Sequence, residues 1–170
     1  SEEDHAAGAG AAAFVLSGAG EAEVVARAEY AEEYPGTRFR PTGSETVKGL
    51  GATGYERQAF TDALAGAVSQ LDLGDVDAAA VQAPNGKLPY RAAGALGVET
   101  DAIQQCAMVH ELGDTGAASV PLGLAKALAD GADQILAASF GSGAGADALL
   151  VENRGLTSSL ALGDDEQVSY

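Results

Sequence analysis

The stretch SFGSGAGADALLVEN, residues 139–153, places three glycines within five positions and sets them between two apolar runs. The glycines have the spacing G-x-G-x-G, whereas the dinucleotide-binding fingerprint requires G-x-G-x-x-G at the start of a helix. No Lys-Ser or Lys-Thr pair follows, which also excludes the phosphate loop of nucleotide hydrolases. The flanking runs, 133–141 and 146–153, read as strands, so the stretch predicts a tight hairpin. The backbone N–H groups of such a turn can also hold an oxyanion.

The rest of the chain alternates strand and helix patterns. Apolar runs bounded by Gly or Pro predict buried strands over 8–18 and 75–84. Residues 21–34 have a helical composition with mixed periodicity, and the alternation within them favours a strand over 21–30. Helical spacing and capping signals predict helices over 55–73, 86–98 and 113–131. Pro121 inside the last helix predicts a kink or a late start. The order β-β-α-β-α-α-β-β indicates an α/β fold, a sheet covered by helices on at least one face.

Two segments lack such patterns. The first, residues 35–54, is rich in Gly, Pro, Thr and Ser and holds Arg38, Arg40 and Lys48, three of the nine basic residues. It is either a solvated loop or a lid that meets an anionic ligand. The second, residues 154–170, is a polar tail or a linker to a further segment. The predicted domain therefore covers residues 1–153.

The charge balance restricts the possible partners. Asp and Glu number 25 against nine Lys and Arg, which gives a net charge of −16. Binding to nucleic acid or to an anionic membrane needs a basic surface, so both are excluded as partners. Few lysines, many acidic residues and small apolar side chains favour a salt-rich cytoplasm, where salt screens the self-repulsion of the surface. An acidic protein of a mesophile is the alternative. A chain that begins at Ser1 without an initiator Met is expected to be part of a longer protein.

Metal and disulfide chemistry are not expected. The single cysteine, Cys106, cannot form an internal disulfide and reads as a small core residue. The two histidines, His5 and His110, lie far apart in the sequence and lack the spacing of metal ligands. We expect no metal site and interpret His110 as structural.

The segment QAPNGKLPYR, residues 82–91, contains an Asn-Gly turn between a predicted strand and a predicted helix. Gln82, Asn85, Lys87 and Arg91 are thereby predicted at the carboxyl end of a strand, where α/β folds tend to bind ligands. Lys87 and Arg91 are four residues apart and can face one phosphate together. A solvated helix start explains the same residues equally well.

The segment GDTGAAS, residues 113–119, is predicted to open the helix over 113–131. Asp114 or Thr115 is the capping residue, and an acidic side chain at this position interacts favourably with the helix dipole. A role as a cap alone is sufficient to explain Asp114 at this stage.

Taken together, these segments resemble the C-terminal half of the thiolase superfamily, over roughly residues 8–153. GAGAAAFVL resembles the glycine-alanine strand that opens that half. QAPNGKLPYRAAGALG resembles the archaeal HMG-CoA synthase segment written His-Gln-Pro-Asn-Gly-Lys. GDTGAASVPLGLAKAL resembles the Gly-Asn-Thr helix start of ketoacyl-ACP synthase III. SFGSGAGADALLV resembles the terminal glycine hairpin of archaeal HMG-CoA synthases.

The resemblance implies half of a thiolase-like fold, a mixed sheet covered by helices. It implies a condensing acyltransferase of HMG-CoA synthase type that uses a coenzyme A thioester as substrate and binds no cofactor covalently. The N-terminal half of the same fold would carry the reactive cysteine. A homodimer, a thiolase as a candidate partner and a cytoplasmic location are expected on the same basis.

The resemblance also assigns site residues. The family's His corresponds to Gln82 in the Asn-Gly-Lys register, or to Val81 in a ketoacyl-synthase register, and its Asn corresponds to Asp114. We expect Gln82 and Asp114 to make polar contacts with the substrate and Ser142 and Gly143 to offer backbone N–H groups. A second group, expected to bind coenzyme A, comprises Asn85, Lys87 and Arg91.

The replacement of His and Asn leaves two alternatives open. Neither Gln nor Val can exchange a proton near neutral pH as His does. An ionised Asp offers only acceptors and would repel a developing enolate. A non-catalytic scaffold subunit of an acyltransferase complex is therefore one alternative. The other is a lipid enzyme like ketoacyl-ACP synthase III.

Overall fold

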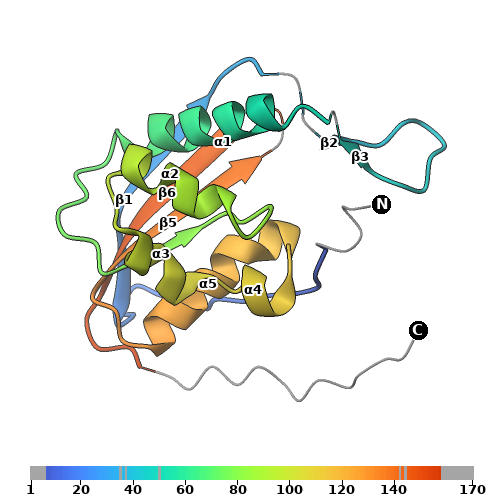
Figure 1. Ribbon diagram of the computed structural model, residues 1–170. Coiled ribbons are helices and arrows are strands. Elements are labelled where there is room, and N and C mark those ends of the chain that lie inside the picture. The colour runs from blue at the N-terminus through green and yellow to red at the C-terminus, as the bar shows by residue number, and fades with distance from the viewer. Residues whose placement is uncertain are drawn as a thin grey trace.

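The computed structural model describes residues 7–34, 36, 38–49, 51–141, 143 and 145–157. Four strands form the main sheet in the order β1-β6-β5-β4 (Figure 1). Their bounds are β1 Ala22–Ala31, β4 Ala78–Val81, β5 Gln134–Gly141 and β6 Gly145–Asn153. Strand β6 is antiparallel to both β1 and β5, whereas β4 is parallel to β5, so the sheet is mixed.

Helices cover both faces of this sheet (Figure 1). Helices α1 and α2 pack on one face, α5 packs on the other, and α3 lies against β4. The helix bounds are α1 Thr53–Val68, α2 Leu88–Leu96, α3 Thr100–Cys106, α4 Val109–Leu112 and α5 Ser119–Ala129. A 3₁₀ turn, Gly116–Ala118, precedes α5, and a two-residue pair, β2 Arg38–Phe39 and β3 Lys48–Gly49, forms a separate hairpin.

The alternation of side chains along β5 supplies both cores. Leu136 belongs to the cluster with Phe60 and Leu64 of α1, whereas its neighbour Ile135 belongs to the cluster with Leu128 of α5. Successive side chains of a strand point to opposite faces, which explains why a strand covered on both faces is continuously apolar. The two clusters thus fix the sheet between two helical layers.

Small residues let α5 lie close to the edge strand β4. All four residues of β4, Ala-Ala-Ala-Val, are buried. A Cβ at Gly123 of α5 would lie 3.0 Å from the carbonyl oxygen of Cys106 and 3.1 Å from the Cβ of Ala80. The high Ala and Gly content therefore has a packing reason in this layer.

Most predicted elements are confirmed. The strands over 21–30, 75–84, 133–141 and 146–153 and the three predicted helices all exist, with bounds shifted by a few residues. The helix predicted over 113–131 starts late, at Ser119, so that Pro121 lies in its first turn, where proline is tolerated. Helices α3 and α4 were not predicted, because helices of seven and four residues are too short to show a period.

The prediction of a buried strand over 8–18 is wrong. Within this segment Val15 is 99% exposed and Leu16 is 89% exposed. The nearby backbone contact is a single bridge between Ala7 and Asp114, with the Gly8 N–H donating to the Asp114 carbonyl at 2.8 Å. An apolar run becomes a strand only where another strand pairs with its backbone, and the described residues contain none at this position.

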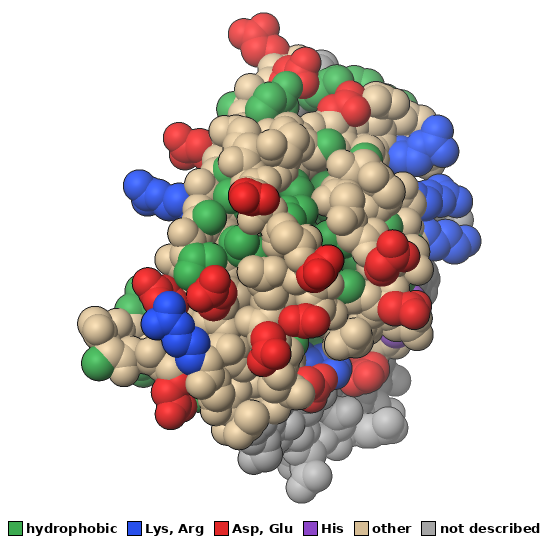
Figure 2. Space-filling model, turned by 90° about the vertical axis from the view of Figure 1, so that its left-hand side faces the viewer, with side chains coloured by type: hydrophobic (Ala, Val, Ile, Leu, Met, Phe, Trp, Pro, Cys, Tyr) green, Lys and Arg blue, Asp and Glu red, His purple; other side chains and the backbone are tan. Residues whose placement is uncertain are grey.

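Part of the α5 side of the sheet is open. Helix α5 contacts β4 and β5, and beside it lies a groove of about 590 Å³ that includes Arg27, Asp147 and Leu149 of β1 and β6. Figure 2 shows hydrophobic side chains gathered in the middle of one face, with acidic side chains spread around them.

Within the described residues, no helix is long and apolar enough to cross a membrane.

Candidate active site

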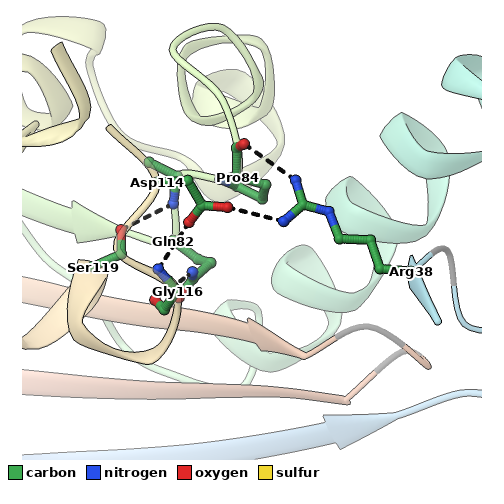
Figure 3. A network of polar contacts seen from close by, with 7 residues as sticks. Arg38, Gln82, Pro84, Asp114, Gly116 and Ser119 are labelled. Carbon is green, nitrogen blue, oxygen red and sulfur yellow. Dashed lines mark hydrogen bonds and ion pairs between the residues drawn. The ribbon is translucent and has the colours of Figure 1, made fainter. Parts of the chain in front are cut away.

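Gln82 lies directly after β4, at the carboxyl end of the strand. Its backbone N–H donates to the carbonyl of Ala138 at 2.9 Å, which continues the parallel pairing one residue beyond β4. Its side chain is buried, and Nε2 donates to the carbonyl of Gly116 at 2.9 Å. The strand thus holds the backbone of Gln82, and the turn before α5 holds its amide (Figure 3).

Asp114 lies in that turn, and its side chain is only 9% exposed. Oδ1 accepts from the backbone N–H of Gly116 at 2.9 Å, and Oδ2 accepts from Nη1 of Arg38 at 2.9 Å. Gly116 has a φ of +57°, which a residue without a Cβ adopts at little cost. The carboxylate therefore stabilises the turn rather than capping α5, for which no side-chain cap bond exists.

Arg38 reaches the site from β2, the first strand of the small hairpin. Besides its ion pair with Asp114, it donates through Nη2 to the carbonyl of Pro84 at 3.4 Å. Residues 35–54 were interpreted either as a solvated loop or as a lid that meets an anionic ligand. The described part of this segment does meet an anionic group, but that group is the protein's own Asp114. The pairing was not predicted, because the two residues are 76 positions apart and no local pattern links them.

A cavity of about 120 Å³ brings these side chains together. Its polar lining consists of Arg38, Glu56, Gln82, Asn85 and Asp114, and its apolar lining includes Phe60, Leu88 and Phe140. The rings of Phe60 and Phe140 pack edge to face with centroids 5.3 Å apart. The cavity is thus lined by charged, amide and aromatic side chains together.

The glycine hairpin borders the same region. Gly141 and Gly145 are paired at its base, and Gly143 in the turn has a φ of +110°. Gln82, Phe140 and Gly141 also line a wider, mostly apolar groove of about 520 Å³ along α5. The predicted hairpin is confirmed. Ser142, the other hairpin residue predicted for the site, lies outside the described residues.

Asn85, Lys87 and Arg91 lie at the start of α2. The Asn85 Oδ1 accepts from the backbone N–H groups of Lys87 at 3.0 Å and Leu88 at 3.1 Å, so it holds the turn that begins the helix. Lys87 and Arg91 are exposed and one turn apart, and the Arg91 N–H donates to the Lys87 carbonyl at 3.2 Å. Of the three, Asn85 lines the 120 Å³ cavity.

Cys106 and His110 take structural positions. Cys106 is 3% exposed, and burial raises the pKa of its thiol to about 12, which suppresses the thiolate that a nucleophile needs. The Nε2 of His110 lies 3.0 Å from the Tyr90 hydroxyl, and the two rings stack with centroids 5.9 Å apart. Both interpretations made from the sequence, a core cysteine and a structural histidine, agree with these positions.

Residues 67–153 match the family described as 3-oxoacyl-[acyl-carrier-protein] synthase III C terminal. The match covers just over half of the chain and runs from the end of α1 to the end of β6. The chain belongs to this family.

Two curated relatives of this synthase III family member are hydroxymethylglutaryl-CoA synthases. The enzyme of Methanopyrus kandleri is 35% identical over 156 residues, which cover 85% of this chain and 43% of the relative. The enzyme of Archaeoglobus fulgidus is 35% identical over 155 residues, which cover 87% of this chain and 45% of the relative. The chain therefore spans less than half the length of these relatives. The resemblance to the C-terminal half of an archaeal HMG-CoA synthase-like protein is confirmed.

Solved structures show the same fold at low identity. 3-Oxoacyl-(acyl carrier protein) synthase III from Pseudomonas aeruginosa PAO1 has a TM-score of 0.63 and 18% identity, covering 79% of this chain and 45% of that one. MvaS, in complex with 3-hydroxy-3-methylglutaryl coenzyme A, has a TM-score of 0.60 and 17% identity, covering 79% and 43%. These likenesses confirm the predicted thiolase-like α/β fold.

Proposed function

We propose that this chain is the C-terminal half of an acyl-thioester condensing acyltransferase of HMG-CoA synthase type. The observation that carries the proposal is the grouping of Gln82, Asp114 and the base of the glycine hairpin at the carboxyl end of β4. In the proposed reaction, a cysteine of the N-terminal half carries the acyl group. The substrate is an acyl-coenzyme A thioester, and no cofactor is bound covalently.

The residues of this half would bind and polarise the thioester. A primary amide has two N–H donors, so the bond from Gln82 to Gly116 leaves one for a thioester oxygen. Backbone N–H groups of Ser142 and Gly143 would add donors where negative charge develops. Asp114 would shape the turn rather than transfer a proton, because both of its oxygens already accept hydrogen bonds.

Lys87 and Arg91 would bind the phosphates of coenzyme A. Both are exposed at the start of α2, in the segment from which Asn85 and Leu88 line the cavity. In a chain of net charge −16, two cations one turn apart attract a phosphate group locally, whereas most of the acidic surface repels it. We also propose a cytoplasmic homodimer in which the N-terminal half covers the open part of the sheet.

The test is the condensation of acetyl-CoA with acetoacetyl-CoA by the full-length gene product. Q82A should lower turnover by about 100-fold if the amide stabilises a developing oxyanion. Q104A is the matched control, because Gln104 is exposed on α3, away from the cavity. Q82H should raise turnover by adding a group that can transfer protons near neutral pH. Equal rates for Q82A, Q104A and wild type would refute the site.

One observation favours a second candidate, a non-catalytic scaffold subunit. Both carboxylate oxygens of Asp114 and one donor of the Gln82 amide are engaged in hydrogen bonds that stabilise the turn at Gly116. A scaffold would show no condensation and would co-purify with an active acyltransferase such as a thiolase. Comparison of acyl-CoA with acyl-ACP as donor separates the third candidate, a lipid enzyme like ketoacyl-ACP synthase III, from the first.

A further inference from the structure

A continuous series of contacts links the β2–β3 hairpin to the Gln82 amide. Arg38 Nη1 donates to Asp114 Oδ2, Asp114 Oδ1 accepts from the Gly116 N–H, and Gln82 Nε2 donates to the Gly116 carbonyl, each at 2.9 Å (Figure 3). Gly116 thus lies between the two side chains and bonds to both through its backbone. A displacement of Asp114 would move the acceptor on which the Gln82 amide depends.

The charges around the cavity show why Asp114 depends on Arg38. The Asp114 side chain is only 9% exposed, and a carboxylate withdrawn from water needs a positive partner nearby. Glu56 lines the same cavity and adds a second negative charge. Among the described residues that line this cavity, Arg38 alone is basic. Its loss would leave two carboxylates in the lining of one cavity, with no basic side chain among the described residues that line it.

The shape of the guanidinium group adds a geometric constraint. Its second terminal nitrogen lies 3.4 Å from the carbonyl of Pro84, two residues after Gln82. Arg38 therefore contacts both the turn that holds Asp114 and the backbone that follows Gln82. The planar guanidinium holds its donors in a fixed fork, whereas a lysine offers a single flexible charge.

We propose that Arg38 is a positioning residue that orients the Gln82 amide through Asp114 and Gly116. The use of the oriented amide in condensation rests on the proposed function, whereas the coupling between Arg38 and the amide does not. Arg38 need not touch the substrate. It keeps one N–H of Gln82 on Gly116 and thereby directs the remaining donor toward the cavity.

Hydrogen exchange of the full-length protein tests the physical coupling. R38Q should speed exchange in both 38–49 and 113–118 by about two- to fivefold, the range for loss of a half-exposed ion pair. D114N should act similarly, and R38Q/D114N should exchange no faster than either single variant, because both remove one interaction. R40Q is the matched control, since Arg40 lies two residues on and is exposed. Unchanged exchange at 113–118 in R38Q, or additive effects, would overturn the coupling.

Turnover tests the orienting role. R38Q should lower kcat for condensation by at least about tenfold, given the sensitivity of rates to misplaced groups, with little change in KM for the coenzyme A ester. The same substitution in a Q82A background should have no further effect. R38K, which keeps the charge but not the fork, should give an intermediate kcat. If R38Q fails to fold, R38K replaces it in both comparisons.

The two measurements separate the two proposals. A wild-type protein that does not condense acyl-CoA would refute the proposed function, while hydrogen exchange would still decide whether Arg38 is coupled to the 113–118 turn. A further loss of kcat when R38Q is added to Q82A would show that Arg38 acts independently of Gln82. That result would overturn the orienting role even in an active enzyme.

Discussion

The buried thiol of Cys106 makes the stability of the protein depend on pH at alkaline values. Burial raises the pKa of its thiol from 9.0 to about 12. Between these values the unfolded chain loses the proton while the folded protein keeps it, so stability is expected to fall as pH rises through this window. Below about pH 9 both states are protonated, and the thiol makes no pH-dependent contribution.

The variant C106A isolates this effect. Its free energy of unfolding should fall less between about pH 8 and 10.5 than that of the wild type. Tyr34, whose pKa is raised to about 12 chiefly by its hydrogen bond to Asp62, is present in both proteins and cancels in the comparison. Denaturant titrations at the two pH values measure the difference. Equal pH slopes would contradict the account.

A second prediction concerns the backbone conformation of Gly143 in the turn of the glycine hairpin. With a φ of +110°, a Cβ at this position strains the backbone even though no other atom lies within 4 Å. G143A should therefore destabilise the protein by about 1–3 kcal/mol. The control is G54A, because Gly54 lies in α1 with equally open surroundings and no positive φ. A loss as large in G54A as in G143A would rule out backbone strain as the cause.

Residues of the candidate site were predicted unevenly. Local signals located Gln82 after a strand and Asp114 before a helix, and the family resemblance assigned both to the site. The structure places both at one cavity. Arg38 was noted only as a cation in a loop rich in Gly and Pro. Its partner depends on how a distant hairpin folds back, and this information is not contained in any local spacing.

At the level of elements, close packing between α5 and β4 makes a direct prediction. G123A should destabilise the protein by about 1–3 kcal/mol, because its Cβ would meet a backbone carbonyl and a buried strand that have little room to move. The control, G94A, lies on the exposed side of α2 with nothing within 4 Å. G94A should stabilise by about 0.5–1 kcal/mol. Thermal unfolding of both variants measures the contrast, and equal shifts in Tm would contradict it.

Element prediction succeeded where the apolar pattern met its partner within the chain. The runs over 133–141 and 146–153 pair with each other through a short glycine turn, so local sequence was enough to predict them. The run over 8–18 is also apolar but has no pairing strand among the described residues, and its large side chains remain exposed. Hydrophobic patterning indicates the tendency to form a strand, but not the presence of a partner.

For the whole molecule, the net charge of −16 predicts a strong dependence on salt. At 0.1 M salt the screening length is about 10 Å, and at 1 M it is about 3 Å. The acidic surface should repel itself at low salt, so Tm should rise as KCl is increased. Sucrose at matched osmolarity is the control for effects that do not involve charge. A Tm independent of KCl would remove the inference of a salt-rich cytoplasm.

For the whole domain, the architecture was predicted correctly, but the exposure of two apolar surfaces was not. The mixed sheet between helical layers followed from the order of elements and the family resemblance, and the family match confirms it. The open part of the sheet beside α5 and the run over 8–18 remain exposed within the described residues. This exposure was not predicted, because a local pattern does not show which other segment covers an apolar surface.

The most direct test of the central claim is the mass of the full-length protein after incubation with acetyl-CoA. An acyl-thioester condensing enzyme should gain one acetyl group, held on a cysteine outside the present chain and released by hydroxylamine. C106A should gain the same group, because the buried Cys106 takes no part. No covalent acetyl group on the wild-type protein, or one attached to Cys106, would contradict the account.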